Sequence, residues 1–156
     1  MTDDSRLTSY CGLYCKDCIP SRTDLYDLAA RLEAVLSDLK FERYAELKAG
    51  QTYWSASNAV FKEYQHFIDV LHSIRGVECR SICREGGGWK GERCPVRNCA
   101  IGRGLAGCWD CDEHKACRHL EPLLEFHPNL AYHLELIKTE GIDKWASKRR
   151  GHYPWS

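Results

Sequence analysis

Two segments of the chain have the spacing of apolar residues that is typical of amphipathic helices. Hydrophobic side chains recur every three or four positions over residues 23–40 and again over residues 58–75. The apolar positions are Leu25, Leu28, Leu32, Val35, Leu36 and Leu39 in the first segment, and Val60, Phe61, Tyr64, Phe67, Ile68, Leu71 and Ile74 in the second. We expect each set to form the buried face of its helix, with residues 50–57 supplying the turn.

The two predicted helices have equal length, so an antiparallel hairpin would return the chain to its starting point. At about 1.5 Å per residue, each helix spans roughly 27 Å. We therefore expect Cys79 to lie near Cys18. Residues 41–49 either continue the first helix or form a separate short one.

The pattern changes beyond the hairpin. Residues 77–118 have little periodicity and many glycines, so we expect mostly loops and turns there. A helical pattern returns at Pro122, with a break at Pro128 and an end at Gly141. Residues 142–156 then add one short helix and a tail.

The sequence thus predicts a mainly α fold in a single domain, residues 1–156. A helical hairpin and C-terminal helices would pack around an irregular cysteine-rich metal-binding segment. The parts are an N-terminal cysteine motif (1–20), the helical hairpin (21–76), a cysteine- and glycine-rich segment (77–118), and C-terminal helices with a tail (119–156).

Composition narrows the class of protein. The formal net charge is +0, so no overall field attracts nucleic acid or an anionic membrane. No apolar run approaches the roughly 20 residues of a membrane-spanning helix, and the polar, acidic start does not resemble a signal peptide. We expect a cytoplasmic protein. Clustered cysteines in a reducing compartment indicate metal chemistry, whereas disulfides are the alternative if a leader has been removed.

All ten cysteines are candidate metal ligands. They are Cys11, Cys15, Cys18, Cys79, Cys83, Cys94, Cys99, Cys108, Cys111 and Cys117. Two CxxC pairs, Cys15 with Cys18 and Cys108 with Cys111, have the spacing that lets two thiolates converge on one zinc ion, and a tetrahedral site takes four. The ten thiols could fill two such sites with two left over, and His114 or His119 could replace one. The pairing stays open.

Two other functions remain as alternatives. Cys11, Cys15 and Cys18 form CxxxCxxC, a spacing that holds iron–sulfur clusters in radical enzymes, so an iron–sulfur redox protein or enzyme is the first. The chain lacks the βαβ alternation of the barrel those enzymes need. The second is a finger-like nucleic-acid-binding protein, because residues 80–103 contain six basic residues and only two acidic ones. Thiolate metal sites would also attract those cations, and the sequence favours a binding module over an enzyme.

The ordered series of motifs resembles a known family. It consists of the CGLYCKDC segment at residues 11–18, GGGW at 86–89, CPVRNC at 94–99, and CWDC at 108–111 followed by Cys117. In this order they are similar to the family called domain of unknown function 3795, over about residues 10–140. The resemblance implies a small cysteine-rich metal-binding domain, and it implies no substrate, reaction or partner.

Overall fold

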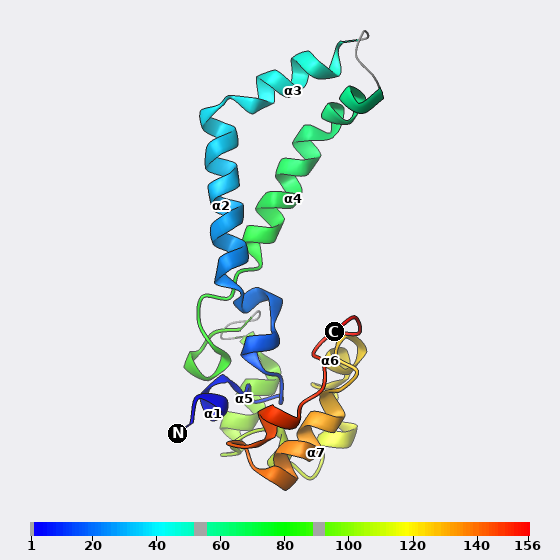
Figure 1. The fold of residues 1–156 in the computed structure, drawn as a ribbon. Helices are drawn as coiled ribbons and strands as arrows, with labels where there is room; N and C mark the ends of the chain where they lie inside the picture. The colour runs from blue at the N-terminus through cyan, green and yellow to red at the C-terminus, as the bar shows by residue number, and fades with distance from the viewer. Residues whose placement is uncertain (1, 52–55, 89–92) are drawn as a thin grey trace. The chain divides into compact units, whose positions relative to one another are not determined.

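The computed structural model describes residues 2–51, 56–88 and 93–156 (Figure 1). These residues form seven α-helices and several 3-10 turns without any strand, so the mainly α prediction is confirmed. None of the helices in these ranges has the length and apolarity needed to cross a membrane. The chain divides into two compact units. We call Arg22–Glu78 the hairpin unit, and Met1–Ser21 with Cys79–Ser156 the thiol unit.

The hairpin unit contains the two predicted helices. Its elements are α2 (Thr23–Asp38), α3 (Phe41–Ala49), the 3-10 helix η3 (Ala56–Glu63) and α4 (Tyr64–Gly76). Helices α2 and α4 run antiparallel and side by side (Figure 1), and Glu33 of α2 pairs with both His72 and Arg75 of α4. The second predicted helix, residues 58–75, is a 3-10 helix up to Glu63 and an α-helix only from Tyr64 onward. Helix α3 is separate because Lys40 adopts a left-handed conformation with a φ of 52°.

Aromatic rings pack together where α3 meets η3 and α4. The ring of Phe41 lies 5.2 Å from Tyr44, 6.1 Å from Phe61 and 5.4 Å from Tyr64, measured between ring centroids. Such contacts stabilise the short α3. Of the turn predicted at 50–57, residues 52–55 lie outside the described residues.

The predicted buried face of α2 is wrong. Five of its six apolar residues are exposed, with exposed fractions between 38% and 67%: Leu25, Leu28, Leu32, Val35 and Leu39. The helix instead buries Tyr26 and Ala29. Because Glu33 holds the adjacent side of the helix against α4, the leucine stripe is turned away from its neighbour. The periodicity indicated one apolar side of this helix. The side that packs within the hairpin unit is a second, shorter one, which contains Tyr26 and Ala29.

The thiol unit combines three-residue 3-10 turns with short α-helices. Its elements are α1 (Asp3–Leu7), η1 (Cys15–Asp17), η2 (Ile19–Ser21), η4 (Cys83–Glu85), α5 (Pro95–Gly102), η6 (Cys108–Asp110), η7 (His114–Ala116), α6 (Glu121–Phe126), α7 (Leu130–Glu140) and η8 (Trp145–Lys148). Its core contains Leu120, Leu130, Leu134 and Ile137 around Trp145. The Trp145 indole N–H donates to Thr8 Oγ1 at 2.9 Å, which ties the C-terminal part to the N-terminal part.

The C-terminal elements follow the prediction in part. Helices α6 and α7 form on either side of Pro128, and Gly141 ends α7 with a φ of 84°, a conformation that favours glycine. The short helix expected after Gly141 is reduced to η8. The last residues do not form a free tail, because His152 is buried and Asn129 donates to the carbonyl of Gly151 at 2.9 Å.

The expected closure of the chain is confirmed. The backbone N–H of Cys79 donates to the carbonyl of Pro20 at 2.6 Å. The segments that enter and leave the hairpin therefore meet inside the thiol unit, and Cys79 lies close enough to Cys18 for the two thiols to interact electrostatically. Thiols separated by sixty residues of sequence are neighbours in space.

Candidate metal centre

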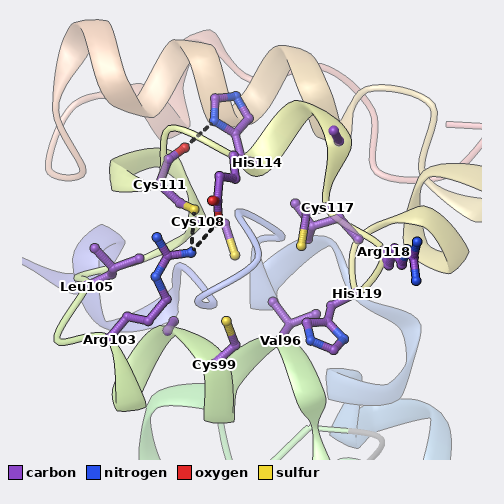
Figure 2. A pocket seen from close by; sticks show the side chains of 14 residues that line it. Val96, Cys99, Arg103, Leu105, Cys108, Cys111, His114, Cys117, Arg118 and His119 are labelled. Atoms are coloured by element: carbon purple, nitrogen blue, oxygen red, sulfur yellow. Dashed lines mark hydrogen bonds and ion pairs between the residues drawn. The ribbon is translucent and has the colours of Figure 1, made fainter.

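All ten cysteines are free thiols and belong to the thiol unit. Four of them line one cavity of about 490 Å³. These four, which we call the cavity thiols, are Cys99, Cys108, Cys111 and Cys117. Figure 2 shows their sulfur atoms directed toward the interior of the cavity. Residues from three separate elements thus bring four thiols to one place.

Short, tight turns hold three of the cavity thiols. In η6 the backbone N–H of Cys111 donates to the carbonyl of Cys108 at 3.2 Å, and the N–H of Cys117 donates to the carbonyl of His114 at 3.4 Å. Gly107 precedes η6 and allows the close approach of Trp109, since a Cβ at this position would lie 2.2 Å from the indole ring. The CxxC geometry follows from a glycine and the turn hydrogen bond between Cys111 and Cys108.

Helix α5 supplies Cys99 and was not predicted. Pro95 occupies the first turn, where a missing N–H costs nothing, and Val96 and Ala100 bury one side of the helix. A single eight-residue helix with two buried apolar positions produces too weak a periodic signal to be recognised in a glycine-rich segment. Apart from α5, the described residues of segment 77–118 form loops and three-residue 3-10 turns, as expected.

His114 positions the site and does not face the cavity thiols. Its ring is buried and points toward α7 (Figure 2). Nδ1 lies 2.7 Å from the carbonyl oxygen of Cys111, and Nε2 lies 3.3 Å from Glu135. Both ring nitrogens are therefore engaged. His119, the other candidate histidine, lines the cavity and is exposed.

A guanidinium group lies directly against one of the cavity thiols. Arg103 Nη1 donates to Cys111 Sγ at 3.3 Å and to Glu113 at 2.9 Å (Figure 2). Burial and, to a lesser extent, the neighbouring thiols of Cys11, Cys117, Cys111 and Cys99 together raise the pKa of Cys108 to about 12. A positive charge beside such crowded thiols stabilises their charged form. Sequence reasoning placed cations near the thiols but did not single out Arg103.

We call the remaining six cysteines the second thiol group, and one of them, Cys11, also interacts with Cys108 of the cavity thiols. They are Cys11, Cys15, Cys18, Cys79, Cys83 and Cys94. Burial raises the pKa of Cys15 to about 11, and the thiols of Cys18, Cys83 and Cys79 contribute to this rise. Burial likewise raises the pKa of Cys11 to about 11, and Ser9 Oγ lies 3.1 Å from its sulfur. The second group therefore surrounds Cys15 and Cys83.

Proximity in the sequence does not decide which thiols share a group. Cys94 and Cys99, which lie five residues apart in the CPVRNC motif, separate, since Cys94 raises the pKa of Cys11 and Cys83 whereas Cys99 lines the cavity. Five residues along a helix correspond to a rotation of roughly 140°, which directs the two side chains apart. Within CxxxCxxC, the thiol of Cys11 interacts with those of Cys83 and Cys94.

Neither thiol group has the geometry of a complete metal coordination sphere. Within the part of the chain that the structure describes, no group of three or more His, Cys, Asp or Glu side chains is arranged to hold a metal ion. Four thiolates around one zinc ion would be about 3.8 Å apart, given a Zn–S bond of about 2.3 Å. The cavity thiols must therefore move inward to bind a single ion.

Several of the basic residues at 80–103 form contacts that stabilise the folded chain. Arg97 is buried and donates to the carbonyls of Cys83 and Gly87 at 3.2 and 2.7 Å. Arg84 donates to the carbonyl of Thr8 at 2.8 Å, and its guanidinium lies 4.5 Å from the ring of Tyr10. Together with Arg103, these residues are engaged with backbone, ring and thiol groups. Lys90 lies outside the described residues.

The fold and the thiol groups define a small helical, cysteine-rich protein. The family model described as "Protein of unknown function (DUF3795)" matches residues 7–122. Because the match covers well over half of the chain and all ten cysteines, the protein belongs to this family, as its motifs indicated. Searches of curated proteins and of solved structures gave no match.

Proposed function

We propose that this protein binds metal through cysteine thiolates, with the four cavity thiols as its principal site. The observation that carries the proposal is their common orientation into one cavity (Figure 2). Thiolates are the preferred ligands of zinc in structural sites, and a CxxC pair with two further cysteines is a frequent ligand set. The site would cross-link α5, η6 and the segment before α6.

Zinc is the first candidate. A zinc ion with four thiolates carries a net charge of about −2, and the Arg103 guanidinium on Cys111 Sγ is placed to compensate part of it. Four protein ligands would leave no position for water, so the role of the ion is structural and not hydrolytic. The second thiol group would supply donors for a further ion. Free thiols in this number suit a reducing compartment such as the cytoplasm.

The width of the site favours an iron–sulfur cluster as a second candidate. The cavity thiols surround about 490 Å³, and no three of them meet around a single point. A four-iron cluster spreads its cysteine ligands farther apart than one ion does, so it would demand less movement of the chain.

Metal analysis of protein purified without oxygen and without added metal tests the proposal. We expect about one or two zinc ions per chain and no absorbance in the visible range. Iron with matched sulfide and a broad band near ~400 nm would support the second candidate. Absence of both metals from the freshly purified, folded protein would refute metal binding.

Paired variants assign the site. The double variant Cys108→Ser/Cys111→Ser should lose one metal equivalent relative to wild type. Asp112→Asn is the matched control, because Asp112 follows the same turn and its side chain is 99% exposed. A double variant that retains the full metal content would show that the cavity thiols are not ligands.

A further inference from the structure

One face of the hairpin unit is apolar and exposed. On α2 it comprises Leu25, Leu28, Leu32, Val35 and Leu39, and on α4 and its C-terminal end Phe67, Val70 and Val77. Together these side chains expose roughly 600–900 Å², which is comparable with the roughly 800 Å² that each partner buries in a standard protein interface. Monomeric proteins rarely expose contiguous apolar patches of this size.

The α2 residues repeat with the period of a helix–helix seam. Their spacings alternate between three and four, which is the a/d pattern of two helices that pack along their length. All five are leucine or valine, without a polar interruption. The side of α2 that packs within the hairpin is a different one, which buries Tyr26 and Ala29.

Each long helix therefore has two apolar sides. At 3.6 residues per turn, the exposed stripe of α2 is rotated by roughly 110° from its buried side, and on α4 Phe67 is rotated by roughly 40° and Val70 by roughly 100° from the buried Leu71. Because α2 and α4 are antiparallel (Figure 1), these rotations bring both stripes to the same face of the hairpin. Helices with two adjacent apolar sides are typical of four-helix bundles.

We propose that this apolar face binds the same face of a second copy of the chain, so that two hairpins form a four-helix bundle. A two-fold dimer needs a self-complementary surface, and a leucine stripe with mixed charge beside it meets this need. The net formal charge of +0 means that two copies do not repel each other.

Charges beside the stripe fix the register. Arg31 and Asp38 flank it on the side away from α4, and neither forms an ion pair with any residue that the structure describes. If two α2 helices pack antiparallel with Leu32 of one copy opposite Val35 of the other, then Arg31 of each copy faces Asp38 of the other. Two symmetric ion pairs result, as at the flanking positions of coiled coils.

Sedimentation velocity of the full chain, in reducing buffer with its metal in place, tests the dimer. We expect wild type at micromolar concentration to have a mass of twice 17.9 kDa. Leu28→Glu/Leu32→Glu should raise the dissociation constant at least about 100-fold and give monomers. Ala34→Glu, which places the same charge on the exposed far side of α2, should remain dimeric. Wild type that stays monomeric at about 100 μM would overturn the proposal.

Charge reversal tests the register without touching the apolar stripe. Arg31→Asp should weaken the dimer about tenfold, because like charges then meet across the interface. Arg31→Asp/Asp38→Arg should restore it. Circular dichroism would establish that each variant keeps its helices. A dimer that survives Leu28→Glu/Leu32→Glu with intact helices would place the interface elsewhere and contradict the inference.

Discussion

The thiol unit and the hairpin unit differ in the regularity of their elements and in the apolar side chains that they bury. The thiol unit has short, irregular elements but a real core, in which Trp145 and Leu130 are completely buried. The hairpin unit has long, regular helices, and among its described residues the buried hydrophobic side chains are few: Tyr26, Ala29, Ala45 and Leu71. All ten cysteines lie in the first unit, and the largest apolar stripe lies on the second.

This contrast shows that long, regular helices do not by themselves bury many large apolar side chains. Helices gain most of their stability from burying an apolar face, so the hairpin lacks a partner for part of its surface. Three-residue turns contribute little on their own, so the thiol unit depends on its core and on the cross-links we propose. The following predictions separate the two units, from the largest expected effect to the smallest.

Metal removal should affect only the thiol unit. A strong chelator at neutral pH should abolish the protection of backbone amides in α5 and η6, because metal–thiolate binding energy stabilises these turns. Amides of α2 and α4 should keep their protection. Hydrogen exchange with mass spectrometry measures both, and the same chelator already saturated with zinc is the control. Equal loss of protection in the two units would contradict the separation.

Core truncation should also distinguish the units. Trp145→Ala should cost about 3–5 kcal/mol of unfolding free energy, because it empties a buried site and removes the hydrogen bond to Thr8. Leu47→Ala, at a position on α3 that is 71% exposed, should change the unfolding free energy by less than about 0.5 kcal/mol. Urea unfolding followed by circular dichroism measures both. Similar effects of the two substitutions would mean that the assigned core is wrong.

Acid should destabilise the thiol unit through His152. Burial, with smaller contributions from the nearby His127 and His133 and against the opposing effect of Asp17, lowers its pKa from 6.5 to about 4. Between pH 6.5 and 4 the unfolded chain binds a proton that the folded chain does not, so stability falls as the pH falls. The loss should reach about 2–3 kcal/mol near pH 4 and be absent above pH 7.

His152→Phe tests this pH dependence. The substitution keeps a ring against His127 and Tyr153, whose centroids lie 4.5 and 4.6 Å away, and it removes the titrating group. Unfolding free energies measured between pH 7.5 and 4.5 should fall less steeply for the variant. Any metal held by the thiolates as proposed would be lost alike from wild type and variant in acid, so parallel curves would show that His152 does not cause the pH dependence.

The smallest effect concerns the cation beside the cavity. Arg103→Met removes the donor to Cys111 Sγ and should weaken metal binding about tenfold, in keeping with other residues that contact a ligand atom. Competition with a colorimetric chelator measures the affinity. Lys138→Met is the control, because Lys138 pairs with exposed Asp112 outside the cavity. Equal affinities in both variants would show that Arg103 has only a structural role.

The fold was largely predictable where local patterns decide it. The lengths of α2, α6 and α7 follow from apolar spacing and from Pro128 and Gly141. The side of α2 that is buried did not follow, because the choice depends on Glu33 and its two partners on α4, which are about forty residues away in the sequence. Helix α5 escaped prediction because only two of its positions are buried and apolar.

The candidate site was predictable by residue type but not by grouping. The cysteine spacings identified every thiol and kept Cys108 with Cys111, since one turn holds both. They left the other pairings open, and the rotation of α5 separates Cys94 from Cys99 although the two lie only five residues apart in the sequence. Long-range contacts such as Arg103 with Cys111 leave no periodic signal in the sequence.

X-ray absorption spectroscopy at the edge of the bound metal tests the central claim most directly. If the cavity thiols hold zinc, the first coordination shell should contain sulfur only, at about 2.3 Å. If they hold a cluster, the iron spectrum should show a sulfur shell with iron–iron scattering beyond it. A first shell of nitrogen and oxygen atoms would mean that any bound metal sits on other side chains, and it would contradict the account.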